Sequence, residues 1–275
     1  MPGTLYLVPT PIGNLGDISR RMADTLAQVD FLAVEDTRVT VKLLNHLGLK
    51  KPMVTYHRHN ATPAGEAILR RLLAGEHCAL VTDAGTPAIS DPGEELVALC
   101  AANGVPVLAI PGPCALVTAL SVSGLPTARF TFEGFLPQNK KNRRAHLDSL
   151  AGEVRTMLFY EAPHKLSATL SDLAETFGPQ RPITLCRELT KLHEEVWRTT
   201  LGEAAAHYQS QEPRGEFVLV VEGAPPAVQE ADPQAALELV AQLRAEGLSL
   251  KEAAAQAAPQ FGLKKKQLYD LALGK

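Results

Sequence analysis

The sequence predicts an α/β protein with two compact domains and a small helical module at its C-terminal end. Short apolar runs alternate with amphipathic stretches from residue 5 to residue 111, which is typical of a mostly parallel sheet covered by helices on both faces. A chain of 275 residues is long for a single hydrophobic core. Hydrophobic residues make up 45% of the chain but aromatic residues only 5%, a composition that suits an α/β protein rich in Leu, Val and Ala.

The N-terminal half alternates predicted strands with predicted helices. The strands are expected at residues 5–8, 31–34, 53–56, 78–81 and 105–110. The first helix follows Ser19, whose hydroxyl can cap it, and continues to about residue 28. The second helix ends at Gly48, because glycine readily takes the backbone angles that terminate a helix. The remaining two are expected over residues 63–74 and 92–102.

Each of these strands is followed by a polar or conformationally restricted segment. In chain order the segments are PTPIGN, EDTR, YHRHN, DAGTP and PGPCA. The two that extend over residues 9–17 and 83–93 are dense in glycine and proline, which fix unusual backbone shapes. Any one segment could be a simple turn. The carboxyl ends of parallel strands meet at one edge of a sheet, so five such segments together predict a ligand site there.

Several well-known site motifs are absent from the sequence. No G-x-G-x-x-G follows the first strand, and there is no phosphate loop, no G-x-S-x-G elbow and no H-E-x-x-H zinc helix. These absences argue against hydride transfer, nucleotide hydrolysis, serine hydrolysis and zinc proteolysis.

Eight motifs stand in an order that resembles a known family. They are PTPIGNLGDIS, VEDTR, VTDAGTPAISDPG, IPGPCA, FEGFLP, FYEAPHK, CRELTK and GEFVLVVEG, between residues 5 and 223. This series resembles the ribosomal small-subunit RNA cytidine-2′-O-methyltransferases of the tetrapyrrole-methylase superfamily. Members that methylate precorrins usually have a G-x-G-P-G-type loop after the first strand, where this chain has PTPIGN at residues 9–14. This departure favours RNA over a corrinoid as the substrate.

The resemblance implies two α/β/α domains of the tetrapyrrole-methylase type, residues 1–113 and 114–225, in a homodimer. It also implies that S-adenosylmethionine binds in the cleft between the domains. Carried over to this chain, the cofactor contacts fall on Pro9, Ile12, Asp83, Gly85, Thr86, Ile89, Cys114, Ala115, Ala162 and Glu216. Relatives have aspartate where this chain has Thr86, and Asp83 lies three residues earlier. Either of these two residues is therefore a candidate for a polar contact with the cofactor.

The second half of the chain is expected to contain a second sheet. A helix over residues 115–123 joins the domains, and strands are expected from residue 130 and over 156–160, 183–186, 195–200 and 217–221. The last two of these strands are interpreted as an antiparallel pair. One helix begins at residue 140, and a second, amphipathic helix contains Leu166, Leu170 and Leu173.

A linker is predicted between Pro225 and Pro233, followed by a helical module over residues 233–275. Residues 248–275 contain five lysines against Glu252 and Asp270, a charge of +3 in a chain whose formal net charge is −3. Lys264, Lys265 and Lys266 begin the last predicted helix. A solvated tail that packs on the body is one interpretation. The resemblance to the family's terminal helix-turn-helix segment favours RNA contact instead.

A second group of basic residues stands at the start of the helix after residue 139. Lys140, Lys141, Arg143 and Arg144 are a solvated helix start in one interpretation and a phosphate-binding patch in the other. The second is favoured if the cofactor cleft must admit an RNA chain. Arg38 is a further candidate for phosphate binding.

Methyl transfer to a ribose hydroxyl benefits from a proton acceptor close to that hydroxyl. Carboxylates at strand ends are the candidates, and we expect Glu35, Asp36, Arg187 and Glu188 to carry the catalytic step, with Glu161 also considered. Residues 35–38 have an alternative interpretation as a helix N-cap with acidic residues in its first turn. Positioning of the two substrates is the alternative to carboxylate catalysis.

The four cysteines are widely spaced, without C-x-x-C or histidine ligand spacing, so we expect thiols rather than disulfides or a metal site. No apolar stretch reaches the ~20 residues of a membrane span, and we expect a cytoplasmic protein.

The function that the resemblance implies is S-adenosylmethionine-dependent 2′-O-methylation of a cytidine in 16S rRNA, either as RNA or in the small ribosomal subunit. The alternatives are a small-molecule methyltransferase of the precorrin or diphthine type and a non-catalytic ribosome assembly factor. The lysine triplet argues against the small molecule, and the rigid loops of a deep crevice argue against a pure binder.

Overall fold

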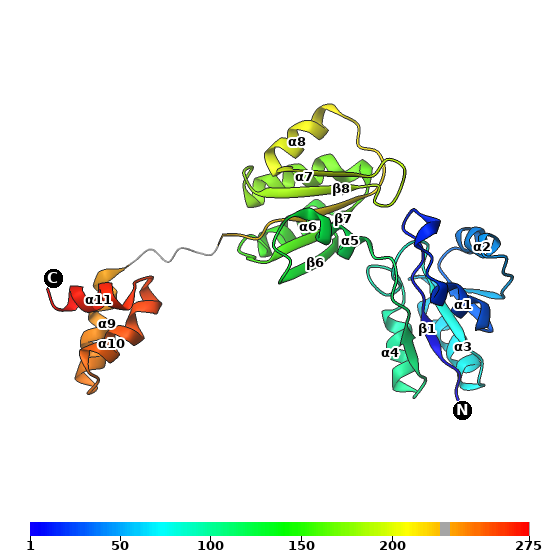
Figure 1. Cartoon of the computed structure of the whole chain (residues 1–275), viewed down its shortest axis with the longest axis horizontal. Coiled ribbons are helices and arrows are strands. Elements are labelled where there is room, and N and C mark those ends of the chain that lie inside the picture. The colour runs from blue at the N-terminus through cyan, green and yellow to red at the C-terminus, as the bar shows by residue number, and fades with distance from the viewer. Residues whose placement is uncertain (226–231, 275) are drawn as a thin grey trace. The chain divides into compact units, whose positions relative to one another are not determined.

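The computed structural model describes residues 1–225 and 232–274 of the chain, which forms two compact units, residues 1–223 and 224–275 (Figure 1). The first unit contains two five-stranded sheets. Residues 226–231 of the predicted linker lie outside the described residues. Among the helices that the structure describes, none has the length and apolar character needed to cross a bilayer.

The first sheet is parallel throughout, in agreement with the predicted mostly parallel sheet, and its strand order is β3-β2-β4-β1-β5. Its strands are β1 (Leu5–Leu7), β2 (Phe31–Val34), β3 (Met53–Thr55), β4 (Cys78–Val81) and β5 (Val107–Ala109). Every residue of the neighbouring strands β2 and β4 is buried. Continuous apolar strands of this kind are expected where helices cover both faces of a sheet.

Four helices cover the first sheet, two on each face. They are α1 (Arg20–Gln28), α2 (Thr37–His46), α3 (Ala61–Leu73) and α4 (Glu94–Ala102), with a short 3₁₀ turn η1 (Leu15–Asp17) before α1. Successive strand residues point to opposite faces. Phe31 and Ala33 therefore pack with α3 and α4, whereas Leu32 and Val34 pack with α1 and α2. Ser19 caps α1 as predicted, because its hydroxyl accepts a 3.1 Å hydrogen bond from the Met22 N–H.

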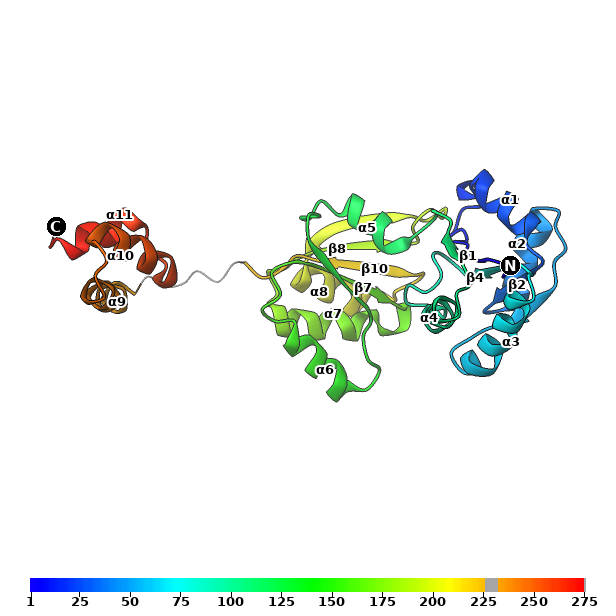
Figure 2. The same ribbon diagram turned by 90° about the horizontal axis from the view of Figure 1, so that it is seen from below.

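The second sheet is mixed, with strand order β6-β7-β10-β8-β9. Its strands are β6 (Phe130–Phe135), β7 (Thr156–Glu161), β8 (Pro182–Arg187), β9 (Glu195–Thr200) and β10 (Phe217–Val221). Its helices are α5 (Ala115–Ser123), α6 (Lys140–Ser149), α7 (Pro163–Phe177) and α8 (Leu201–Ser210). Met157 and Phe159 face the core with α6, α7 and α8, whereas Leu158 faces α5 on the other side. Figure 2 shows α5 on the opposite side of this sheet from α6, α7 and α8.

The prediction that β9 and β10 pair with each other is wrong. Strand β8 lies between them and is antiparallel to both. The sequence interpretation did not include α8, whose 10 residues connect the two strands. A helical connection of this length lets the chain cross over, so β9 and β10 run in the same direction on either side of β8.

The second unit folds around a core of its own. Its helices are α9 (Pro233–Ala245), α10 (Leu250–Ala257), the 3₁₀ turn η2 (Ala258–Phe261) and α11 (Lys265–Ala272), so the three predicted helices are confirmed. Ser249 and Glu252 form a reciprocal capping box that fixes the start of α10. Small buried alanines on α10 pack against Val240 of α9 and Leu268 of α11.

Candidate functional site

Three loops, which follow β1, β4 and β5, are hydrogen-bonded to one another. The main chains of Thr10 and Gly85 exchange two hydrogen bonds of 2.9 and 3.0 Å, which join the first loop to the second. The hydroxyl of Thr86 donates to the carbonyl of Pro113 at 2.8 Å, which joins the second loop to the third. The buried hydroxyl of Thr10 also donates to the carbonyl of Thr82 at 3.0 Å. These contacts hold the predicted loop cluster in one arrangement.

A cavity of about 470 Å³ lies between these loops and the ends of strands in the second sheet. Both walls belong to the first compact unit. The volume is in the range of small-molecule sites, roughly 300–1,000 Å³. The predicted cofactor residues that line it are Ile12, Asp83, Gly85, Thr86, Ile89, Cys114, Ala115, Ala162 and Glu216.

Glycine permits a close approach at two points around the cavity. Gly85 has a φ of +87°, and a Cβ atom there would lie 3.4 Å from Cγ2 of Ile12. A side chain at this position would therefore be strained and would also point toward the lining. A Cβ atom on Gly13 would lie only 2.3 Å from Cγ of Lys191, so the loop after β1 packs directly against a turn of the second domain.

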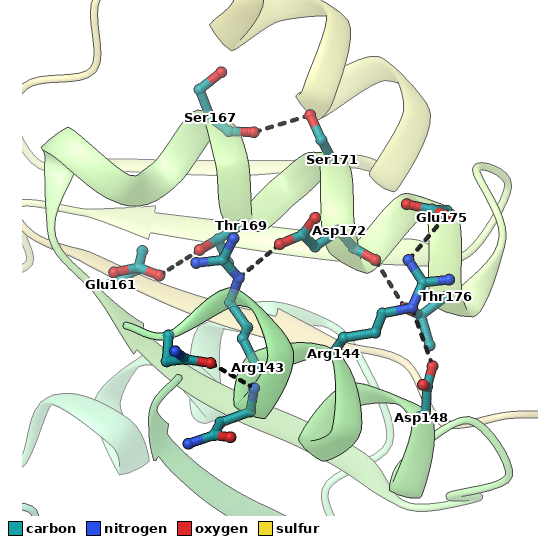
Figure 3. A network of polar contacts seen from close by, with 12 residues as sticks. Arg143, Arg144, Asp148, Glu161, Ser167, Thr169, Ser171, Asp172, Glu175 and Thr176 are labelled. Atoms are coloured by element: carbon teal, nitrogen blue, oxygen red, sulfur yellow. Dashed lines mark hydrogen bonds and ion pairs between the residues drawn. The ribbon is translucent and has the colours of Figure 1, made fainter. Parts of the chain in front are cut away.

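The second wall is formed where β7 ends and α7 begins. The phenolic oxygen of Tyr160 accepts a 3.1 Å hydrogen bond from the Leu116 N–H, which ties β7 to the start of α5. The buried carboxylate of Glu161 accepts hydrogen bonds from the Ala162 N–H at 2.9 Å and from the Thr169 hydroxyl at 2.6 Å. Figure 3 shows this contact between Glu161 and Thr169. Glu161 therefore fixes the start of α7 beside the cavity.

Three carboxyl groups at the first wall have raised pKa values. Burial raises the pKa of Glu35, and the nearby charge of Asp83 adds to this effect. Burial also raises the pKa of Asp83. Burial raises the pKa of Asp91 to about 6, with further contributions from Glu35 and Asp83 that the positive charge of Arg58 opposes. Carboxyl groups with such values in a cavity are candidates for proton transfer near neutral pH.

The predicted catalytic residues separate into two groups. Glu35 lines the cavity, but Asp36, Arg187 and Glu188 are not among its lining residues. Asp36 caps α2 by accepting a 2.8 Å hydrogen bond from the Arg38 N–H, in agreement with the N-cap interpretation. The hydrogen bond from the Arg38 guanidinium lowers the pKa of Asp36 to about 2.

The turn after β8 holds the other two predicted catalytic residues. Arg187 forms a 2.9 Å ion pair with Glu195 of β9. The Glu188 carboxylate accepts hydrogen bonds from Lys191 Nζ at 2.7 Å and from the Glu216 N–H at 2.9 Å. Glu188 therefore connects this turn to the start of β10. A direct catalytic role for either residue stays a prediction.

The predicted cofactor residue Pro9 is buried and is not among the residues that line the cavity. The role of Pro9 and those of the lining residues toward a cofactor also stay predictions.

The basic residues of α6 have different surroundings. Lys140 and Lys141 are exposed. Arg143 forms a 2.6 Å ion pair with Asp172 of α7, as Figure 3 shows, and both side chains are largely buried. Arg144 is more exposed and pairs with Asp148 and Glu175. No contact of these residues tests RNA binding, but Arg143 has a partner that gives it a structural role.

The other predicted RNA-binding residues lie on exposed surfaces. Arg38 is exposed and pairs with Asp36. Lys264, Lys265 and Lys266 are exposed at the start of α11 in the second unit.

Four of the cavity-lining residues that sequence reasoning missed are Phe135, Tyr160, Asp91 and Lys191. All four lie inside motifs that it quoted, namely FEGFLP, FYEAPHK, VTDAGTPAISDPG and CRELTK. Their positions offered a signal. Asp91 lies within a quoted loop, and the other three lie at an expected strand end or within five residues of one. Lys191 donates to both Glu188 and Glu216, at 2.7 and 2.8 Å.

Metal binding finds no support in the described part of the chain, where no group of three or more His, Cys, Asp or Glu side chains is arranged to hold a metal ion. The four cysteines are free thiols, and Cys114 alone among them lines the cavity.

Comparisons with known proteins agree with this architecture. Residues 4–205 match the family described as Tetrapyrrole (Corrin/Porphyrin) Methylases, and residues 230–275 match the RsmI C-terminal HTH domain. The chain is 48% identical over 272 residues to Ribosomal RNA small subunit methyltransferase I of Synechocystis sp. (strain ATCC 27184 / PCC 6803 / Kazusa), covering 98% of each chain. It is 47% identical over 274 residues to the protein of that name from Escherichia coli O157:H7, covering 98% of this chain and 95% of the relative.

A solved structure shares the fold at low sequence identity. Uroporphyrin-III C-methyl transferase from Thermus thermophilus, complexed with S-adenyl homocysteine, superposes with a TM-score of 0.57 at 19% identity. The match covers 80% of this chain and 97% of that one. With the family match over most of the chain and relatives close to half identical along its length, the protein belongs to the tetrapyrrole methylase family and is a methyltransferase.

Proposed function

We propose that this protein transfers a methyl group from S-adenosylmethionine to the 2′-oxygen of a cytidine ribose in small-subunit (16S) ribosomal RNA. The observation that carries this proposal is the 47–48% identity to relatives named Ribosomal RNA small subunit methyltransferase I. This identity extends over 98% of the chain. It therefore includes the C-terminal module as well as the two sheets.

The cavity fits S-adenosylmethionine in size and chemistry. Ile12, Ile89 and Leu189 supply apolar surface, and the carboxylates Glu35 and Asp83 suit a cofactor that carries a positive sulfonium. The fixed backbone at Gly85 permits close approach of a ligand. We assign the cofactor contacts to the nine predicted residues that line the cavity, with Pro9 in a supporting role.

The acceptor side of the site is proposed to bind a ribose and its neighbouring phosphates. Glu35 lies in the cavity, where a carboxylate can accept a hydrogen bond from a hydroxyl. Asp36, Arg187 and Glu188 would act by holding the surrounding loops. The exposed cations Arg38, Lys140 and Lys141 are candidates for phosphate contacts.

The proposed substrate implies the partners and the compartment. An enzyme that modifies ribosomal RNA meets 16S rRNA or the small ribosomal subunit in the cytoplasm. We further propose that the protein works as a homodimer.

Mapping the methylated product tests the function directly. The purified protein, S-adenosylmethionine carrying a labelled methyl group, and small subunits lacking the modification should yield labelled 2′-O-methylcytidine after digestion to nucleosides. The phosphodiester bond after the modified residue should also resist alkali, because the 2′-oxygen can no longer attack it. Naked 16S rRNA serves as a parallel substrate. A label found only on a base, or no label on RNA, would contradict the proposal.

The lysine triplet of α11 provides a second prediction. If Lys264, Lys265 and Lys266 contact phosphates, replacing all three with alanine should flatten the slope of log affinity against log salt concentration by roughly 2–3, since each contact contributes about 0.7–0.9. The measurement is RNA binding by the full chain over a series of salt concentrations. Turnover at saturating RNA should change little.

A packing role for the triplet makes a different prediction. In that case the triple variant would melt at a lower temperature and keep the wild-type salt slope. Lys251→Ala on α10 is a matched control, because it removes one exposed charge from the same module. An unchanged slope in the triple variant would rule out the RNA contact.

A further inference from the structure

Asp91 is a cavity-lining carboxylate outside the predicted catalytic and cofactor sets. Five carboxylates line the cavity, and Glu161, Glu216 and Asp83 each accept a hydrogen bond from a neighbouring group. Across the residues that the structure describes, the side chains of Glu35 and Asp91 accept none. A half-buried carboxylate without such a partner leaves its oxygens available to a bound ligand.

The loop that carries Asp91 is held in a strained conformation. Ala88 and Ser90 have φ angles of +65° and +70°, values that non-glycine residues rarely adopt. The carbonyl of Ser90 accepts a hydrogen bond from the Arg58 guanidinium, which connects this loop to the segment after β3. Backbone strain of this kind persists where surrounding contacts enforce it, and it concentrates at functional sites.

Asp91 lines the cavity together with residues of both walls. On the first wall it is close enough to Glu35, Asp83 and Arg58 for their charges to affect it. On the second wall its charge acts on Tyr160 of β7. Glu35, by contrast, interacts with His57 and Arg58 of its own domain. Of the two carboxylates without hydrogen-bond partners, Asp91 is the one whose charge affects a residue of the second wall.

We propose that Asp91 is the catalytic residue that accepts the proton of the ribose 2′-hydroxyl. This inference rests on the proposed function. The 2′-oxygen forms a bond to the methyl carbon while the carbon–sulfur bond breaks, and the electron pair of that bond stays on sulfur. The hydroxyl proton passes to the Asp91 carboxylate and then to solvent. The products are the 2′-O-methyl ribose and a neutral thioether.

The raised pKa of Asp91 suits this role. Burial, with the negative charges of Glu35 and Asp83 added and Arg58 opposing, brings the pKa to about 6. The carboxylate is therefore mostly ionised at pH 7 and is a stronger base than an ordinary aspartate. Because the ionised form is the active one, the rate of the chemical step should rise with pH up to about 6 and become constant above about 7.

Asp91→Asn keeps the shape of the side chain and removes its basicity. In single-turnover reactions at saturating cofactor and RNA, we expect the methyl-transfer rate to fall by about 10²-fold or more. The remaining rate should no longer increase between pH 5 and 7. Calorimetry should give a cofactor Kd within about twofold of wild type, which also shows that the cavity is folded. Asp91→Glu retains a proton acceptor and should keep the rise with pH at a lower rate.

Asp24→Asn is the matched control, because Asp24 is an exposed aspartate on α1 away from the cavity. It should keep both the wild-type rate and the pH profile. A wild-type rate and pH profile in Asp91→Asn would overturn the proposal. So would a lower rate with an unchanged pH profile and weaker cofactor binding, since Asp91 would then hold the positive charge of the cofactor. If the wild-type protein forms no 2′-O-methyl product, the proposed function itself fails.

Discussion

Replacing Arg143 with alanine is expected to lower the free energy of unfolding of the full chain's first unit by about 2–3 kcal/mol. The guanidinium pairs with Asp172 at 2.6 Å, and the two side chains are only 14% and 18% exposed. Removing one partner of a buried pair costs about 3–5 kcal/mol, because the other charge remains buried alone, and the partial exposure reduces that figure. For a unit of this size the melting temperature should fall by roughly 4–12 °C.

Arg144→Ala is the matched control for this stability measurement. Arg144 is the next residue on α6, but its side chain is 45% exposed in its ion pairs. Exposed pairs contribute about 0–1 kcal/mol, so this variant should melt close to wild type. If the two variants melted at the same temperature, the buried pair of Arg143 would contribute no more stability than the exposed pairs of Arg144. A change in the salt slope of RNA binding by Arg143→Ala, without loss of stability, would instead restore the phosphate interpretation of Arg143.

Replacing Gly85 with valine is expected to weaken cofactor binding by about 10²-fold or more, equivalent to roughly 3 kcal/mol. A β-branched residue at a φ of +87° is strained, and its Cβ atom would meet Ile12 across the cavity lining. Gly85 also forms the main-chain bridge to Thr10, so a shift of the loop after β4 would disturb the loop after β1 as well. Calorimetric titration with S-adenosylmethionine measures the effect.

Gly104→Val is the control that separates the effect of backbone strain from the effect of a side chain beside the cavity. Gly104 also has a positive φ, of +69°, but a Cβ atom there would have no neighbour within 4 Å. This variant should lose some stability and keep the wild-type cofactor Kd. If Gly85→Val bound the cofactor normally while remaining folded, the assignment of the cofactor to this loop would be wrong.

The parallel first sheet was predictable because its strands are short, continuous apolar runs bounded by clear turn residues. The loop cluster followed from the same observation, since parallel strands end at one edge. Pairing within the second sheet was not predictable from local patterns. The apolar runs of β9 and β10 fit several arrangements, and only the missed helix α8 between them shows that they cannot form a simple hairpin.

Individual side-chain roles were harder to predict than the position of the site. Glu35 and Asp36 are adjacent in sequence, yet one lines the cavity and the other caps a helix. Arg143 and Arg144 are equally adjacent, yet one is largely buried in an ion pair and the other is 45% exposed. The sequence alone does not distinguish the members of each pair, because their burial depends on how elements that are distant in the sequence pack together. Asp91 was missed for the same reason, since its surroundings come from the segments after β2, β3 and β4 and from β7.

The central position of β10 has a consequence for synthesis of the chain on the ribosome. This strand pairs with β7 on one side and β8 on the other, and all five of its residues are buried. Until residue 221 has emerged, β7 and β8 have no partner at those edges, and the backbone N–H and C=O groups there remain unpaired. Glu216, Phe217 and Val218 also line the cavity. The nascent polypeptide therefore completes its second sheet and its cofactor cavity in the same event, when the last strand inserts between two that were made before it.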